Sequence, residues 1–96
     1  MTKTPPQFAI HYKTDGTAKQ VKPTNGEDFT LEELQSFVGG YIEIVSLNDM
    51  FLVVNEEGKL NNLPVNANAT ALWEQVYGKT DVIVGDVLYT CKRWIN

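Results

Sequence analysis

The side chains that could form a catalytic centre are few and widely separated in this sequence. Nucleophilic catalysis needs a nucleophile, a base and an orienting group, and the chain has one cysteine and one histidine. His11 alternates with Ile10 and Tyr12, a pattern typical of a strand histidine that lies at the surface or has its hydrogen bonds satisfied. Cys91 follows a hydrophobic segment, where a lone cysteine usually serves as a small buried apolar residue. We therefore expect no catalytic residues.

Metal and phosphate sites also lack their characteristic patterns. No Cys/His pair has ligand spacing and no Asp-rich loop follows the calcium pattern, so we expect neither a metal nor a cofactor. Gly39-Gly40 ends a predicted helix and is not followed by Lys-Ser/Thr, unlike a phosphate-binding loop. Glu56 and Glu57 fall in a predicted turn, where solvated carboxyls are poor acid/base catalysts. Glu43 lies within a predicted strand, where a glutamate usually points to water unless it faces a cleft.

The polar residues best suited to recognition lie between residues 55 and 70. This segment holds five asparagines, and an asparagine side chain offers a donor and an acceptor together, which suits amide or nucleobase edges. The start of the following helix attracts anions. Turns and helix caps are the alternative explanation for these asparagines. The segment and its surroundings supply eight candidate ligand-binding or partner-binding residues: Tyr41, Glu43, Asn55, Glu56, Lys59, Asn66, Thr70 and Trp73.

Two pairs of strands and two helices are expected to position these residues. Phe8 to Tyr12 and Ala18 to Lys22 flank an Asp15-Gly16 turn and predict a first hairpin. Residues 41–47 and 50–54 are rich in β-branched and aromatic side chains and predict a second antiparallel pair.

The two predicted helices have clear ends. Thr30-Leu31-Glu32-Glu33 is a capping box that predicts a helix over 31–38, followed by Gly39 as its left-handed stop. A second helix should begin within residues 66–68, with either asparagine as its cap, and end before Gly78.

The sequence order predicts an α+β fold. Residues 50–54 are apolar on both faces, which indicates a central strand covered by helices on one side and by a loop, a terminal segment or another subunit on the other. Residues 81–90 are extended, and Gly85-Asp86 predicts a bulge or a tight reversal that splits them into two short strands. The expected order is β-β-α-β-β-α-β in two layers, an antiparallel or mixed sheet with both helices on one face.

Length, charge and hydropathy exclude several classes of protein. A chain of 96 residues supports one domain over 1–96, which we divide into an N-terminal hairpin extension, 1–28, and a core, 29–90. The formal charge of −4 has the wrong sign for phosphate neutralisation, so we expect no nucleic-acid partner. Apolar stretches reach only about five residues against the roughly 20 that span a bilayer, so we expect no membrane segment. One cysteine and no secretory signal predict a cytoplasmic protein.

Four ordered blocks carry a family resemblance: FTLEELQSFVGGYIE (29–43), VNEEGKL (54–60), LPVNANAT (63–70) and IVGDVL (83–88). Together they resemble a family of small proteins of unknown function encoded by bacteria, phages and mobile elements. The resemblance spans about residues 29–88 and leaves the first 28 residues outside it. It implies no established activity, although proteins of this kind often act by binding, for instance by blocking a host enzyme or sequestering a nucleotide signal. The shared polar positions are Glu43, Asn55, Glu56, Lys59, Asn66 and Thr70.

Our first hypothesis is a small, non-catalytic cytoplasmic binding or accessory protein of phage or mobile-element origin. It would act through protein–protein contact at residues 55–70. A homodimer is the simplest way to hide a sheet edge or an uncovered sheet face.

The alternative is a protein that binds or sequesters a small nucleotide-like ligand. An aromatic side chain such as Tyr41 or Trp73 would stack on a base, while Asn66 and Thr70 would hold a phosphate. An enzyme that uses Glu43 as its base is a third hypothesis.

Overall fold

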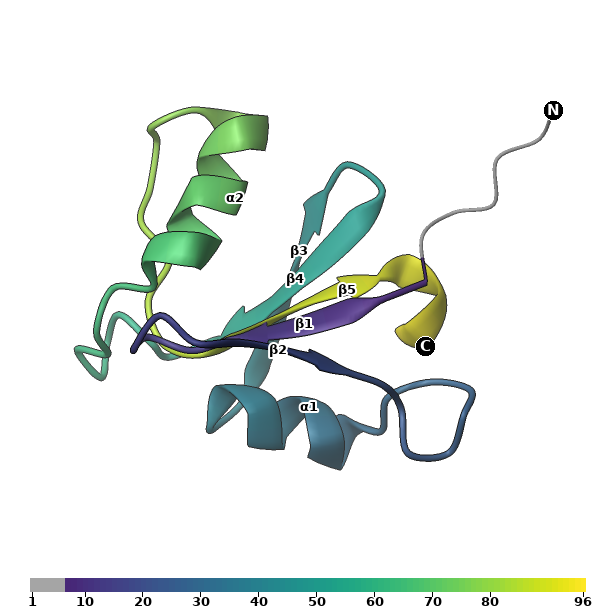
Figure 1. Ribbon diagram of the computed structural model, residues 1–96. Coiled ribbons are helices and arrows are strands. Elements are labelled where there is room, and N and C mark those ends of the chain that lie inside the picture. Colours follow the sequence, from purple (N-terminus) through teal and green to yellow (C-terminus); the bar gives the residue numbers. More distant parts are fainter. Residues whose placement is uncertain (1–6) are drawn as a thin grey trace, which may run out of the picture.

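The computed structural model describes residues 7–96, which form a five-stranded antiparallel sheet and two helices (Figure 1). The first six residues of the predicted extension lie outside the described residues. The strand order across the sheet is β2-β1-β5-β4-β3. The elements follow the predicted order: β1 (Ala9–Tyr12), β2 (Ala18–Val21), α1 (Leu31–Val38), β3 (Ile42–Leu47), β4 (Met50–Asn55), α2 (Ala67–Tyr77), β5 (Val87–Cys91) and a final 3₁₀ turn η1 (Lys92–Trp94).

The capping box fixes the bounds of α1 as the sequence predicts. The Glu33 amide donates to the Thr30 hydroxyl at 3.1 Å, and the Thr30 amide donates back to the Glu33 carboxylate at 2.9 Å. Gly39 ends the helix with φ 77°, and its amide donates to the Gln35 carbonyl at 2.8 Å.

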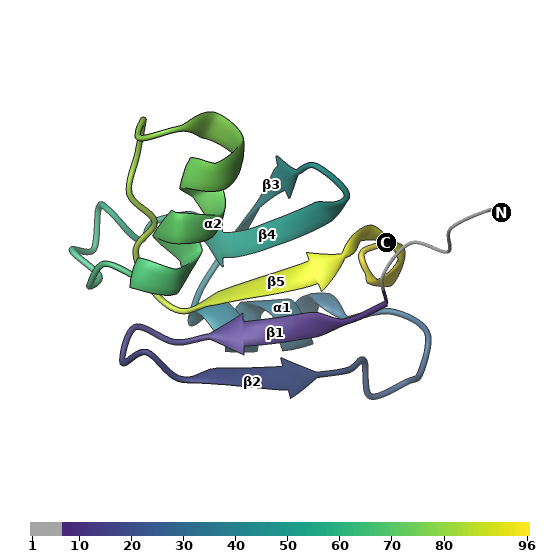
Figure 2. The same cartoon turned by 45° about the horizontal axis from the view of Figure 1, so that its top comes forward.

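The two helices lie on opposite faces of the sheet (Figures 1 and 2). Alternate side chains of a strand point to opposite faces, so β4 places Val53 on one face and Leu52 and Val54 on the other. Val53 belongs to the apolar cluster that contains Leu34 of α1. Leu52 and Val54 belong to a second cluster that contains Ala69 of α2.

The prediction of two layers with both helices on one face is therefore wrong, and the domain has three layers. A strand that is apolar on both sides must be covered twice. In this fold α1 covers one face and α2 the other, in place of the loop, terminal segment or second subunit expected on the second face.

The chain bends at Gly85 before β5, where the sequence predicts a bulge or a reversal, but the predicted split of residues 81–90 into two strands is wrong. Gly85 has φ 80°, a left-handed conformation that favours glycine, and a Cβ at this position would also displace the tip of the Leu63 side chain, 2.8 Å away. Of the residues before it, Val84 forms an isolated bridge with Val65, and only Val87–Cys91 is a strand.

Asn66 joins three parts of the chain at the start of α2. Its side chain is fully buried; the amide group donates to the Tyr12 carbonyl at 3.0 Å and to the Gly85 carbonyl at 2.9 Å. The side-chain oxygen accepts from the Ala69 amide at 3.0 Å and so caps the helix. This one residue ties the end of β1, the turn before β5 and the first turn of α2 together.

We predict that Asn66→Ala lowers the free energy of unfolding by about 2–4 kcal/mol, because it removes the cap and the side-chain donors to the buried Gly85 carbonyl and the half-buried Tyr12 carbonyl. Asn66→Asp should also destabilise the domain, because it keeps the acceptor but sets a carboxylate against the same two carbonyls. Urea unfolding of both variants tests this. The control is Asn68→Ala, an exposed position of the same helix; equal losses for Asn66→Ala and Asn68→Ala would contradict the assignment.

Candidate functional site

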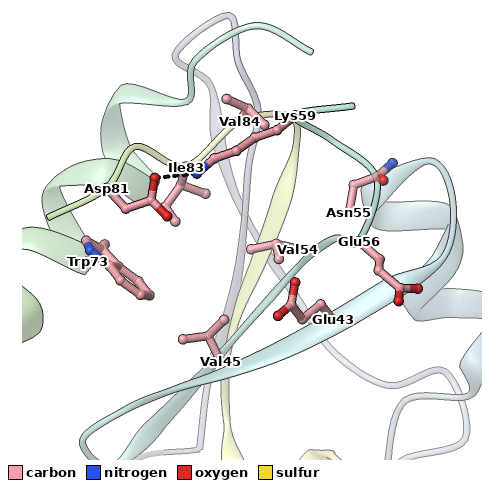
Figure 3. A pocket seen from close by; sticks show the side chains of 10 residues that line it. All are labelled: Glu43, Val45, Val54, Asn55, Glu56, Lys59, Trp73, Asp81, Ile83 and Val84. Atoms are coloured by element: carbon pink, nitrogen blue, oxygen red, sulfur yellow. Dashed lines mark hydrogen bonds and ion pairs between the residues drawn. The ribbon is translucent and has the colours of Figure 1, made fainter. Parts of the chain in front are cut away.

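A hollow of about 200 Å³ lies between α2 and the adjoining ends of β3 and β4 (Figure 3). It gathers residues from four separate segments of the chain. Five of the eight predicted site residues line it: Glu43, Asn55, Glu56, Lys59 and Trp73. The remaining lining residues are Val45, Val54, Asp81, Ile83 and Val84.

The floor of the hollow is apolar and carries one carboxylate. Glu43 and Val54 are directly paired across β3 and β4, and Val45 follows on the same face two residues after Glu43. In Figure 3 the Glu43 carboxylate points into the hollow beside these two valines, while Glu56 lies at the side away from Trp73. Within residues 7–96, neither Glu43 nor Glu56 forms an ion pair.

Trp73 forms the opposite wall and is held in place by two contacts. Its indole N–H donates to the Thr80 hydroxyl at 3.0 Å, and its ring packs on the Tyr77 ring with centroids 4.4 Å apart. The Tyr77 hydroxyl in turn donates to the Ser46 carbonyl of β3 at 2.6 Å. The aromatic wall is thus fixed relative to the strand that carries Glu43.

An ion pair between Lys59 and Asp81 closes one side of the hollow. The hydrogen bond from the Lys59 ammonium, with a second from the Val82 amide, holds the pKa of Asp81 below its ordinary value. Because Asp81 neutralises the ammonium, the carboxylates of Glu43 and Glu56 leave the hollow with two formal negative charges.

The other three predicted residues lie outside the hollow. Asn66 has the capping role that the sequence also allowed, and its full burial and three hydrogen bonds leave no group for a ligand. The Thr70 hydroxyl accepts from the Ile83 amide at 2.9 Å and donates to the Ile83 carbonyl at 3.3 Å, so it fastens α2 to the segment before β5. Tyr41 is 65% exposed and borders a different depression beside Gly39 and Gly40.

Asn55 lies between these two depressions and has a mainly structural role. Its amide group donates to the Val38 carbonyl at 3.1 Å, and its side-chain oxygen accepts from the Glu57 amide at 2.8 Å. It therefore links the end of α1 to the turn after β4 and fixes where Glu56 leaves the strand.

Sequence reasoning missed the residues contributed by the segment before β5, above all Asp81. An acidic residue just after a helix and before an apolar run is an ordinary surface pattern, and its pairing with Lys59 spans 22 positions. The sequence held one hint of such an acidic partner: Lys59 is the sole cation between residues 55 and 70.

The two residues considered first for catalysis have structural surroundings. A ring nitrogen of His11, Nε2, lies 2.8 Å from the Phe37 carbonyl, and Cys91 is buried. Among residues 7–96, no three His, Cys, Asp or Glu side chains come close enough together to hold a metal ion.

The fold and the site thus define the class of protein: a small antiparallel α+β domain with a hollow at one edge of its sheet. The chain matches the model of a domain of unknown function, DUF3846, over residues 9–93, and it belongs to that family. The match begins at β1, so it includes the hairpin that the block resemblance left out. No curated protein and no solved structure is significantly similar to the chain.

Neither helix within residues 7–96 has the length and apolar character that a bilayer span requires.

The depressed pKa of Asp81 predicts a pH dependence of stability. The unfolded chain takes up this proton near pH 3.8 and the folded chain only at lower pH, so the contribution is present above that value and is lost as the pH falls below it. Asp81→Asn should flatten the fall of the unfolding free energy below about pH 4. Asp49→Asn, which removes a carboxylate from the β3–β4 turn, is the control; identical pH profiles for the two variants would refute the role of the ion pair.

Proposed function

We propose that this chain is a non-catalytic binding or accessory protein that contacts a partner protein through the edge of β3 and the hollow beside it. The observation that carries the proposal is the edge of β3, which is the last strand of the sheet, pairs with no other strand within residues 7–96 and borders the hollow. The protein–protein contact expected from the sequence is then centred on β3, beside residues 55–70.

The hydrogen-bonding pattern identifies which backbone groups of β3 are free. The Glu56 amide donates to the Tyr41 carbonyl at 2.9 Å, so Tyr41 faces β4. In an antiparallel pair, the backbone groups of successive residues point alternately toward and away from the partner strand. The N–H and C=O groups of Ile42, Ile44 and Ser46 therefore point away from β4. The Ser46 carbonyl already accepts a hydrogen bond from the Tyr77 hydroxyl. Ile42 and Ile44 are left with outward backbone groups that an extended segment of a partner would satisfy.

Of the features that usually protect an edge strand, β3 has an inward-pointing charge, Glu43, but lacks three others. Its sequence, Ile42–Leu47, contains no lysine and no proline, and it pairs with β4 in one unbroken register. The opposite edge, β2, is four residues long and carries Lys19. An exposed edge next to side-chain pockets is a common surface for an added strand.

Three exposed apolar residues adjoin residues that line the hollow, either along the chain or, for Val65, through its bridge with Val84. Leu60 is 77% exposed, Val82 46% and Val65 54%. Leu60 and Val82 are the chain neighbours of the paired residues. Exposed apolar side chains near a hollow favour protein contact over a purely solvated surface.

The nucleotide-binding alternative receives less support from the same site. Trp73 would offer a ring for stacking, but Asn66 and Thr70, to which the alternative assigned the phosphate, are engaged within the fold. The negative charge of the hollow also opposes a phosphate. A cytoplasmic location and a phage or mobile-element origin are proposed on the sequence resemblance and on the single cysteine.

The proposal is tested by using the Ile44→Pro variant as bait in affinity capture from an extract of the host cell. The proline removes only an N–H that faces away from β4, so the sheet should persist while an added strand loses a hydrogen bond and meets the ring. We expect partner recovery to fall at least about tenfold relative to Ile44→Val, which preserves the N–H.

Circular dichroism must first establish that Ile44→Pro is folded. Ile44→Lys serves as a second variant, because a lysine on an exposed edge position discourages strand addition without a backbone change. Equal recovery by the valine, proline and lysine variants would refute the β3 edge as the contact surface.

A further inference from the structure

The hollow beside β3 has a chemical preference that the proposed function leaves open. Two of its carboxylates, Glu43 and Glu56, have no cationic partner within residues 7–96, whereas Lys59 is already paired with Asp81. Both carboxylates are exposed to water, so their attraction for a cation becomes strong only when the bound side chain displaces water from the apolar floor. We propose that the hollow receives an arginine side chain of the partner segment; this inference rests on the proposed function and specifies its partner.

The walls of the hollow match the parts of an arginine side chain. The methylene stem would lie along Val45 and Val54, as long charged side chains do on apolar surface. The planar guanidinium would stack on the Trp73 ring and donate to the Glu43 carboxylate at the same time. An ammonium is more strongly hydrated and has no plane to stack, so lysine fits this combination less well.

The position of Glu43 also connects the hollow with the edge of the sheet. Glu43 and Val45 lie on β3 itself, and their side chains are on the same face as α2. When a segment pairs with the outward groups of Ile42 and Ile44, every second one of its side chains projects over that same face. One of them is then adjacent to Glu43 and enters the hollow, while the backbone of the segment remains on the edge.

The aromatic wall is already in the geometry that this contact needs. The Thr80 hydroxyl and the Tyr77 ring hold Trp73, and Tyr77 is itself anchored to β3. A preorganised wall lowers the entropic cost of binding, since no rotamer has to be fixed on contact. The net negative charge excludes the phosphate-bearing ligands that would otherwise compete for an aromatic surface.

The test uses three short peptides of the form acetyl-Thr-Val-X-Val-Thr-amide, in which X is arginine, lysine or citrulline. Citrulline keeps the shape of arginine and removes its charge. Binding is followed by tryptophan fluorescence in a Trp94→Phe background, which leaves Trp73 as the only indole. Trp94 packs edge-on against Phe29 in the cluster on the opposite face of the sheet, so this background change leaves the hollow intact.

We expect the arginine peptide to bind about tenfold more tightly than the lysine peptide and at least about tenfold more tightly than the citrulline peptide. Glu43→Gln should weaken binding of the arginine peptide about tenfold. The matched control is Glu57→Gln, which removes the same charge from an exposed residue that lies outside the hollow.

Two results would overturn the inference: equal binding of all three peptides, or no binding of the arginine peptide up to millimolar concentration. Equal effects of Glu43→Gln and Glu57→Gln would also overturn it, because they would reduce the contact to general charge attraction. The edge proposal is judged separately. If the three peptides bind equally but Ile44→Pro weakens all of them, the arginine pocket fails and the β3 contact stands; if Ile44→Pro changes nothing, the β3 contact fails as well.

Discussion

The buried side chain of Asn66 is the interaction on which the arrangement of this domain depends. It caps α2, and it donates to carbonyls at the end of β1 and at the turn that leads into β5. Because a buried amide must find partners for each of its polar atoms, these three segments can meet in only one way. The start of α2 is thereby set over the sheet, and with it the distance from Trp73 to the strand that carries Glu43. The hollow is a consequence of that placement.

Local signals in the sequence predict most of the fold. The Thr30–Glu33 capping box sets the start of α1, and glycines after each helix set its end. The assignment of both helices to one face failed for a physical reason. Side-chain alternation shows that β4 is apolar on both faces, but it carries no information on which helix covers which face. That choice is made by the long connection between β4 and α2 and by Asn66, whose partners lie 54 and 19 positions away.

The candidate site was predictable only in part, for the same reason. Glu43, Asn55, Glu56 and Lys59 are close in sequence or lie on paired strands, so a surface that joins them follows from the hairpin β3–β4. The role of Asp81 depends on a contact between distant segments, and it has no local signature. Asparagine is also ambiguous as a residue type, because the groups that recognise a ligand equally well satisfy turns and caps. Burial decides between these roles, and it assigns Asn66 to the fold.

The edge of β3 and the hollow form one surface, in which backbone groups supply general affinity and the carboxylates and the indole supply selectivity. Addition of the partner to β3 at Ile42 and Ile44 is the central claim. Hydrogen exchange of individual backbone amides, measured by NMR without and with a saturating amount of the arginine peptide, tests this claim directly. We predict slow exchange of the Ile42 and Ile44 amides only with peptide bound, together with a shift of the Trp73 indole resonance. Unchanged exchange at both isoleucines, or new protection on β2 in their place, would contradict the account.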